Sequence, residues 1–202
     1  SGVLATRGAS QRAGVEFSTP LGDMEYLKFS YSAQYFHPIT NSLTLHLKTD
    51  LGYGMGLGDT DRLPFFKNYY GGGFGSVRGF ERNRLGPQDT PNPIYGQDSD
   101  AFGGNVKITG TVEVIFPLPF MKDNRSVQAA VFLDGGNIFD TDCNQTQTNC
   151  FKPELGELRY SMGIGGTWLS GFGPITVSLA RGMNDGEFDD TEFFQFSLGQ
   201  GF

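Results

Sequence analysis

Apolar and polar side chains alternate with a period of two along eight segments of this chain. Leu43, Leu45 and Leu47 share one face of such a segment, for example, and Lys48 lies on the other. The eight segments are residues 11–19, 25–36, 43–53, 106–118, 127–133, 158–170, 175–179 and 192–202. A period of two is typical of a β-strand with two different faces. The pattern therefore predicts an all-β, antiparallel fold.

The two faces of these predicted strands differ in charge. Charged residues such as Lys28, Glu113 and Arg159 occupy the polar faces, and the apolar faces carry almost none. Aromatic residues gather at strand ends, as an interfacial girdle would require, and a soluble β-sandwich does not explain this. The aromatic residues in question are Tyr35, Phe36, Phe116, Trp168 and Phe202. We therefore expect an antiparallel transmembrane β-barrel.

The connections support the barrel interpretation. Short turns at residues 37–42, 119–126 and 171–174 alternate with longer loops at about 54–105, 140–157 and 183–191. Only the short link at 21–24 breaks this alternation, because it falls on the long-loop side. Short turns at one end and long loops at the other are typical of outer-membrane barrels.

The composition excludes several other classes of protein. The net charge of −7 disfavours binding to nucleic acid, which needs clustered lysine and arginine. No run of 18 apolar residues predicts a transmembrane helix, whereas transmembrane strands need only about 9–11 residues each. Ser1 begins within the alternating pattern and no signal peptide is present, so we expect a fragment of a longer chain.

Cys143 and Cys150 flank a polar segment, which predicts a disulfide and an oxidising compartment, with two free loop thiols as the alternative.

The loop at 54–105 is too long for a small barrel. An eight-stranded barrel has an interior just wide enough for side chains or one small ligand. The middle of the loop reads YYGGGFGSVRGFERNRLGP, from Tyr69 to Pro87, and Val77 and Phe80 in it look buried. If this segment docks inside, the eight strands supply half of a larger barrel. The alternative is a small structural or pore-forming barrel that closes on its own eight strands.

Arg78 needs an anionic partner if the loop docks in a lumen, because an unpaired buried charge is costly. Pairing the fourth and fifth predicted strands across the turn at 119–126 puts Glu113 opposite Phe132 and makes Asp134 its diagonal neighbour, within about 7–8 Å. The two carboxylates can then share one guanidinium. The alternative is a solvated arginine, with the carboxylates paired elsewhere, for instance to Lys48 or Lys107. Gly79 would permit a tight turn beside Arg78.

Several motifs of the chain are similar to those of a known family. GGGFGSVRGFERNRLGP, VEVIFPLPF, FLDGGNIFDT, GTWLSGFGPITVSLA and FFQFSLGQGF resemble the outer-membrane protein assembly factors, and the likeness covers almost the whole chain. The VRGF element, Val77 to Phe80, is shared with a wider family that includes two-partner-secretion transporters. The resemblance implies a sixteen-strand barrel of which residues 1–202 form the C-terminal half, with periplasmic domains and the first half of the barrel missing. It also implies that acidic residues of the two following strands clamp Arg78 inside the barrel.

The same resemblance implies a function and a set of partners. The family folds and inserts β-barrel proteins into the outer membrane of Gram-negative bacteria without ATP, and no cofactor is expected. The expected partners are the lipid bilayer, nascent β-barrel clients and lipoprotein subunits bound mainly through periplasmic domains, with no nucleic acid. The fragment itself would expose two strand edges, and we expect it to self-associate or to close in a non-native way. The last strand resembles the β-signal of barrel proteins and the weak seam strand of the family, or it is simply a lipid-facing strand. Its relevant residues are Phe194, Phe196, Leu198, Gly199, Gly201 and Phe202.

An enzymatic barrel is the third hypothesis, and the sequence argues against it. His46 and Asp50 lie four residues apart on one predicted strand, about 13 Å by strand rise, and no serine is placed to complete a triad. The acidic stretches GDTD, QDSD and FDDTE lack the spacing of a calcium loop. We therefore predict neither catalysis nor a metal site.

Overall fold

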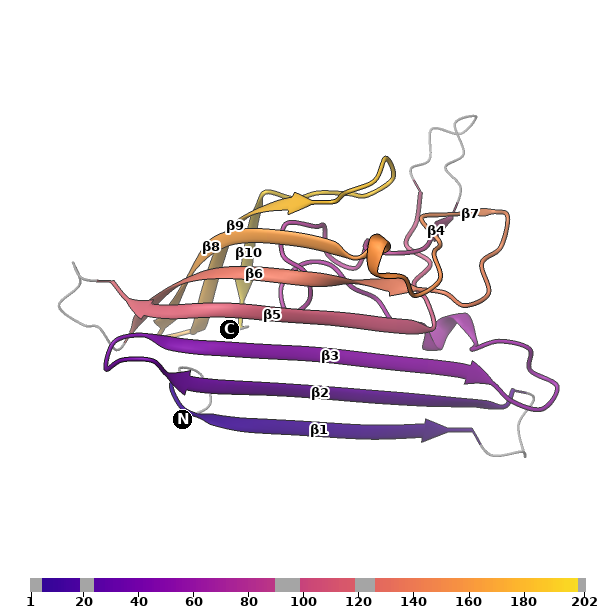
Figure 1. Ribbon diagram of the computed structural model, residues 1–202, viewed down its shortest axis with the longest axis horizontal. Helices are drawn as coiled ribbons and strands as arrows, with labels where there is room; N and C mark the ends of the chain where they lie inside the picture. The colour runs from indigo at the N-terminus through magenta and orange to yellow at the C-terminus, as the bar shows by residue number, and fades with distance from the viewer. Residues whose placement is uncertain (1–4, 19–23, 90–98, 119–125, 200–202) are drawn as a thin grey trace.

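The computed structural model describes residues 5–18, 24–89, 99–118 and 126–199. Its main element is an antiparallel sheet of eight strands in the order β1-β2-β3-β5-β6-β8-β9-β10 (Figure 1). The strands are β1 (Gly8–Phe17), β2 (Tyr26–Pro38), β3 (Thr44–Gly56), β5 (Val106–Pro117), β6 (Val127–Phe139), β8 (Arg159–Ser170), β9 (Gly173–Met183) and β10 (Phe194–Leu198). Each strand pairs with its nearest neighbours along the chain, as the alternating pattern predicts for a meander.

Two short strands that the sequence pattern does not predict form a second sheet. β4 (Gln88–Asp89) lies in the long loop, residues 54–105. It pairs with β7 (Gln147–Thr148) in the cysteine loop, residues 140–157. The described residues thus contain ten strands, so the prediction of eight is incomplete. Two single turns of 3₁₀-helix, η1 (Phe65–Lys67) and η2 (Leu155–Glu157), are the helical elements of the described part, and no helix there is long and apolar enough to cross a membrane.

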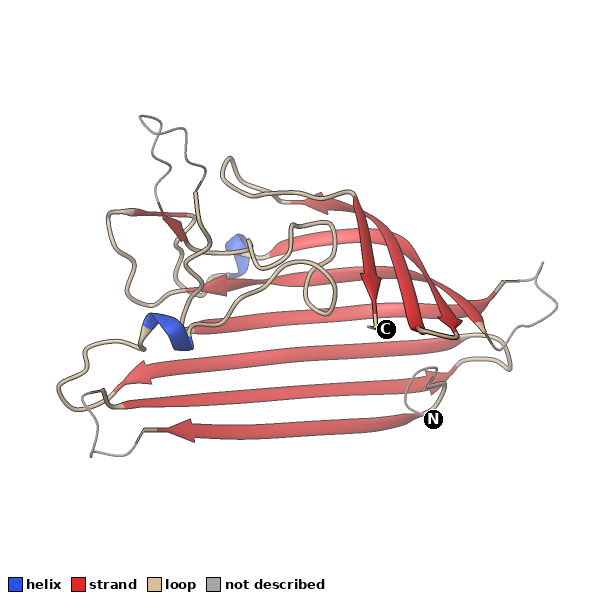
Figure 2. Cartoon of the chain, turned by 180° about the vertical axis from the view of Figure 1, so that it is seen from behind, coloured by secondary structure: helices blue, strands red, loops and turns tan. Residues whose placement is uncertain are grey.

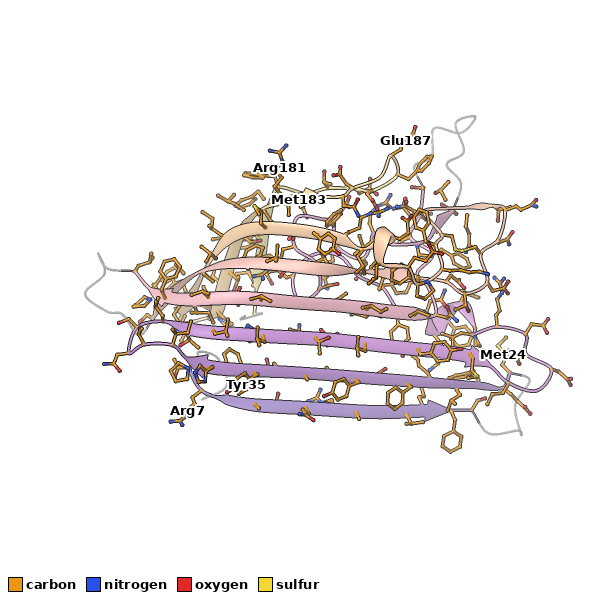
Figure 3. The ribbon with its side chains drawn as sticks, in the orientation of Figure 1. Arg7, Met24, Tyr35, Arg181, Met183 and Glu187 are labelled. Carbon is orange, nitrogen blue, oxygen red and sulfur yellow. A yellow bond between two sulfur atoms is a disulfide. The ribbon has the colours of Figure 1, made fainter. Side chains whose placement is uncertain are left out.

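The two faces of the main sheet reverse the arrangement of a soluble protein. On β6 the apolar side chains of Val131 and Leu133 are 44% and 46% exposed, whereas Asp134 on the opposite face is buried. β5 repeats this, with exposed Val112 and buried Glu113. Figure 3 draws the side chains along the strands. An apolar exposed face suits lipid contact, and a polar buried face suits the lumen of a barrel.

The aromatic girdle is present only in part. Tyr35 on β2 and Trp168 on β8 are exposed on the outer face, each near the end of its strand. Phe36 instead points inward and is buried, because neighbouring residues of a strand face opposite sides. It stacks on His46 with ring centroids 4.1 Å apart. Phe202 lies outside the described residues.

The sheet is curved and open, and the long loop occupies its concave side. β8, β9 and β10 bend around the loop in Figures 1 and 2, while β1 and β10 form the two edges of the sheet and do not pair with each other. A buried cluster of Val77, Phe80 and Leu85 lies within the loop. A second buried cluster, of Phe36, Ile115 and Ala130, lies on the inner face of the sheet. The described residues form an open antiparallel sheet rather than a closed barrel.

Candidate functional site: an arginine clamp on the concave face

The loop turns tightly before and after Arg78. Gly72 and Gly79 have φ values of 102° and 86°, a region that residues with a side chain rarely adopt. At Gly79 a Cβ atom would also lie 3.2 Å from the Ser161 and Ala180 side chains of β8 and β9. Glycine at position 79 is thus required both for the turn and for the close approach of the loop to the sheet.

Arg78 bridges the loop to β5 and β6 through both carboxylates that the sequence pattern singles out. Its Nε and Nη2 atoms donate to the two oxygens of Asp134 at 2.7 and 2.8 Å, and Nη1 donates to Glu113 Oε1 at 2.8 Å. The backbone N–H of Arg78 also donates to Asp134 at 3.0 Å. The structure shows Glu113 directly opposite Phe132, in the register expected from the sequence.

The cluster is almost completely removed from solvent. The side chains of Arg78, Glu113 and Asp134 are 6%, 1% and 0% exposed. Burial removes the favourable hydration free energy of these ions. Their mutual attraction compensates for that loss only with good geometry and further hydrogen bonds. The bidentate contact with Asp134 supplies that geometry. Removing one partner would leave an uncompensated charge, which typically costs about 3–5 kcal/mol.

Two further residues of the cluster were not identified from the sequence. His46 Nδ1 lies 3.1 Å from Glu113 Oε2 and donates to it, so that each oxygen of this carboxylate has a partner. The Arg78 guanidinium carbon lies 3.3 Å from the centre of the Phe132 ring, a cation–π contact. Pairing the segments 43–53 and 106–118 would have found His46, because it lies opposite Glu113 on β3.

Lys48, one of the two lysines considered as alternative partners for the carboxylates, is engaged elsewhere. Lys48 Nζ forms an ion pair with Asp50 at 3.3 Å and donates to the backbone oxygen of Gly75 at 2.8 Å. Lys48 therefore holds the loop at a second point instead of neutralising the clamp carboxylates. Asp50 thus contacts Lys48 and His46 contacts Glu113. The described residues also hold no group of three or more His, Cys, Asp or Glu side chains that could bind a metal.

The residues proposed for the β-signal lie apart from the clamp carboxylates. Phe194, Phe196 and Leu198 are 56%, 54% and 67% exposed on the outer face of β10. Gly199 follows the strand, and Gly201 and Phe202 lie outside the described residues. The strand is shorter than the segment 192–202 expected from the sequence.

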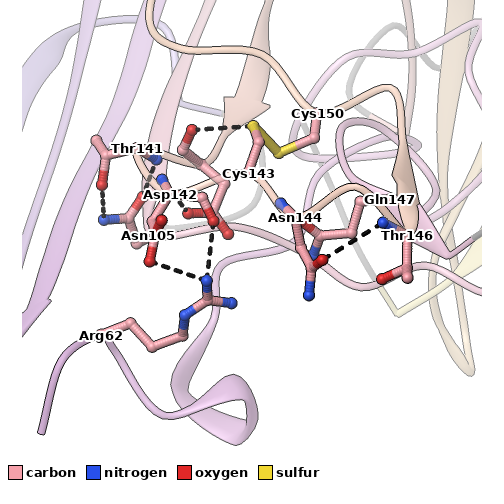
Figure 4. Close-up of a disulfide and its surroundings, with 10 residues drawn as sticks. Arg62, Asn105, Thr141, Asp142, Cys143, Asn144, Thr146, Gln147 and Cys150 are labelled. Carbon is pink, nitrogen blue, oxygen red and sulfur yellow. Dashed lines mark hydrogen bonds and ion pairs between the residues drawn. A yellow bond between two sulfur atoms is a disulfide. The ribbon is translucent and has the colours of Figure 1, made fainter.

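The cysteine loop joins the long loop above the sheet. Cys143 and Cys150 form a disulfide with Cα atoms 5.7 Å apart, as expected from their spacing (Figure 4). Arg62 of the long loop donates to Asp142 at 2.8 Å, and β4 pairs with β7. Burial raises the pKa of the nearby Asp140. The two loops thus form one connected structure at this end of the sheet.

Comparison with known proteins identifies the family. A family model described as the Omp85 superfamily domain matches residues 1–202. The outer membrane protein assembly factor BamA of Neisseria meningitidis serogroup B is 35% identical over 100% of this chain and 27% of its own length. BamA of Neorickettsia risticii is 29% identical over 95% of this chain and 24% of its own length. This chain therefore spans about a quarter of the length of these curated relatives.

A solved structure gives the same result for the fold. The crystal structure of BamA from Haemophilus ducreyi lacking POTRA domains 1–3 aligns with a TM-score of 0.83 and 26% identity, covering 97% of this chain and 39% of that one. The relatives are named as assembly factors, not as enzymes, and they confirm the outer-membrane location expected from the sequence. The resemblance noted in the motifs is therefore confirmed, and the chain belongs to the Omp85 superfamily.

Proposed function

We propose that residues 1–202 form the C-terminal half of a sixteen-strand transmembrane barrel, and that the complete protein folds and inserts β-barrel proteins into the outer membrane. The observation that carries this proposal is the clamp: a long loop is fixed on the polar concave face by Arg78, Asp134 and Glu113. The relatives named as assembly factors support the activity.

The position of the loop supports a barrel larger than eight strands. The loop buries Val77 and Phe80 against the concave face, where the strands of a closed eight-stranded barrel would leave room for side chains only. The edges β1 and β10 are unpaired with each other, so each is available to a further strand. A small self-closed barrel is therefore the weaker hypothesis.

The assembly mechanism follows from an incompletely paired edge. A strand edge presents backbone N–H and C=O groups that an incoming strand can bind by β-augmentation. β10 and the first strand of the complete barrel would form such a seam, next to a bilayer that the barrel thins or distorts. The partners would be the lipid bilayer, nascent β-barrel clients and lipoprotein subunits that attach mainly to periplasmic domains.

The test replaces the clamp residues in the complete protein. We expect Arg78→Ala and Asp134→Arg to lower the amounts of outer-membrane β-barrel proteins in cells that depend on the variant. Arg82→Ala is the matched control, because Arg82 is an exposed arginine of the same loop. Immunoblots must show that each variant reaches the membrane in normal amounts.

Normal β-barrel protein levels in both clamp variants would refute the proposed role of the clamp. A transporter of the same superfamily is the alternative function. Variants of a transporter would lose secretion of one dedicated partner protein, while the general population of outer-membrane β-barrels stayed unchanged.

A further inference from the structure

The loop tip, Val77 to Glu81, contacts the residues that lead into β10 as well as β5 and β6. The backbone N–H of Glu81 donates to Asp190 O at 2.9 Å, and the N–H of Glu192 donates to Gly79 O at 3.0 Å. Phe80 and Thr191 form an isolated antiparallel bridge between these two bonds. The residues directly after Arg78 thus act as a very short strand beside the segment that leads into β10.

Gln195 adds a side-chain connection to this contact. It is the first residue of β10 to face inward, and it is 4% exposed. Its Nε2 atom donates to Phe80 O at 2.7 Å and to Glu192 Oε2 at 3.0 Å, so both amide hydrogens are used. A buried amide that spans the tip and the strand fixes the position of one relative to the other.

The loop tip and β9 bind opposite edges of residues 192–193, which lead into β10. The N–H of Ala180 on β9 donates to Phe193 O at 2.9 Å, whereas the adjacent Glu192 bonds to the loop. Adjacent residues of an extended chain direct their backbone polar groups to opposite edges. The tip therefore lies on the side of the segment away from β9.

β10 has few other attachments to the sheet. It pairs with β9 over the five residues Phe194–Leu198, whereas β8 and β9 pair over the eleven residues from Tyr160 to Ser170 of β8. Phe194, Phe196 and Leu198 project outward and are more than half exposed. The docked tip is thus a large part of what holds the beginning of this strand in place. The Arg84–Asp190 ion pair, at 2.6 Å, strengthens the same connection.

We propose that Gln195 is a positioning residue that ties β10 to the docked loop tip, so that the Arg78 clamp and the last strand order and loosen together. Arg78 binds carboxylates of β5 and β6. The next two residues, Gly79 and Phe80, accept hydrogen bonds from Glu192 and Gln195 at the beginning of the last strand. The loop tip therefore links the middle of the sheet to its edge. The inference draws on the proposed function only for the role of β10 as a seam strand; its physical content is independent of assembly activity.

The test is hydrogen exchange of the β10 amides in the complete protein, reconstituted in lipid. Gln195→Met keeps the length of the side chain and removes both donors. We expect at least roughly three- to tenfold faster exchange at residues 194–198, as the loss of even one of the two buried hydrogen bonds predicts. Ser197→Ala is the control at the next inward-facing position of β10, and exchange in β5 and β6 reports whether each variant is folded.

The decisive variant is Arg78→Ala, because the side-chain hydrogen bonds from Arg78 to Asp134 and Glu113 end on β6 and β5, whereas exchange is measured in β10. We expect it to accelerate exchange in β10 at least as much as Gln195→Met, and the double variant to exchange no faster than Arg78→Ala alone. Unchanged β10 exchange in Arg78→Ala, or multiplicative effects in the double variant, would overturn the proposal.

A cross-link separates loss of coupling from general destabilisation. Cysteines at positions 81 and 190 would join the tip to the last strand across the bond between Glu81 and Asp190. We expect the oxidised cross-link to restore slow β10 exchange in the Arg78→Ala background, and failure to do so would count against the coupling. Normal assembly activity of Arg78→Ala alongside altered exchange would refute the proposed role of the clamp in assembly and leave this inference standing.

Discussion

Arg78→Lys tests whether the shape of the guanidinium, rather than its charge alone, holds the loop on the sheet. The arginine donates three side-chain hydrogen bonds to two carboxylates, at 2.7, 2.8 and 2.8 Å. An ammonium group is a compact point charge and cannot reproduce this fork. We expect it to keep a single hydrogen bond to one carboxylate and to lose the other two.

The magnitude follows from the number of bonds lost. A hydrogen bond to a charged group contributes about 1.5–3 kcal/mol, so the loss of two costs at least about 3 kcal/mol. Since about 1.36 kcal/mol corresponds to a factor of ten, the equilibrium between docked and undocked loop should shift about a hundredfold. The phenyl ring of Phe132 remains available to the new cation, which makes the lower end of the range the better expectation.

The assay is the rate at which a thiol at position 77 reacts with a maleimide. Val77 is 0% exposed, so a cysteine there reacts only when the loop undocks. Both native cysteines are in the disulfide, which leaves Val77→Cys as the single reactive thiol. We expect labelling about a hundred times faster when Arg78→Lys is added, and unchanged labelling when Arg82→Lys is added. A rate within twofold of that of the Val77→Cys parent would show that the clamp does not hold the loop.

Three further predictions concern the turn, the disulfide and the strand edges. Gly79→Ala should accelerate the labelling of Val77→Cys at least tenfold, because position 79 has a positive φ and the new Cβ lies 3.2 Å from its neighbours on β8 and β9. Gly156→Ala is the control and should not change the rate, because no atom lies within 4 Å of its new Cβ. Replacing Cys143 and Cys150 by serine should destabilise the cysteine loop by about 2–3 kcal/mol, seen as faster amide exchange at residues 140–150 but not in β5. The isolated fragment should run as a dimer in a size measurement because β1 and β10 are unpaired edges; a strict monomer with protected amides in both strands would contradict this.

The strand faces and the register of β5 with β6 were accessible from the sequence because both follow from local rules. A side-chain period of two assigns each residue to one face, and a single short turn fixes which residues lie opposite one another. Glu113 and Asp134 could be placed together with Arg78 for this reason. The disulfide was accessible too, because the two cysteines lie only seven positions apart in one loop.

The features that the sequence did not reveal depend on contacts between distant segments. His46 joins the cluster through the pairing of β3 with β5, which a loop of about fifty residues separates in the chain. Gln195 reads as an ordinary inward-facing polar residue until the path of the loop tip is known. β4 and β7 have two residues each, too few for any periodicity. β10 ends at Leu198, and Gly199 directly after it takes a φ of 83°.

The chemistry of the clamp explains why a loop with so many glycines can take one position. An apolar tip such as Val77 with Phe80 gains its stability from buried area, which many orientations supply almost equally. The Arg78 fork is directional and fits two carboxylates on two particular strands. The backbone of Gly79 and Phe80 then has only one path, toward Asp190 and Gln195. The buried charges therefore contribute less to overall stability than to orientation, and the orientation is what brings the tip to the last strand.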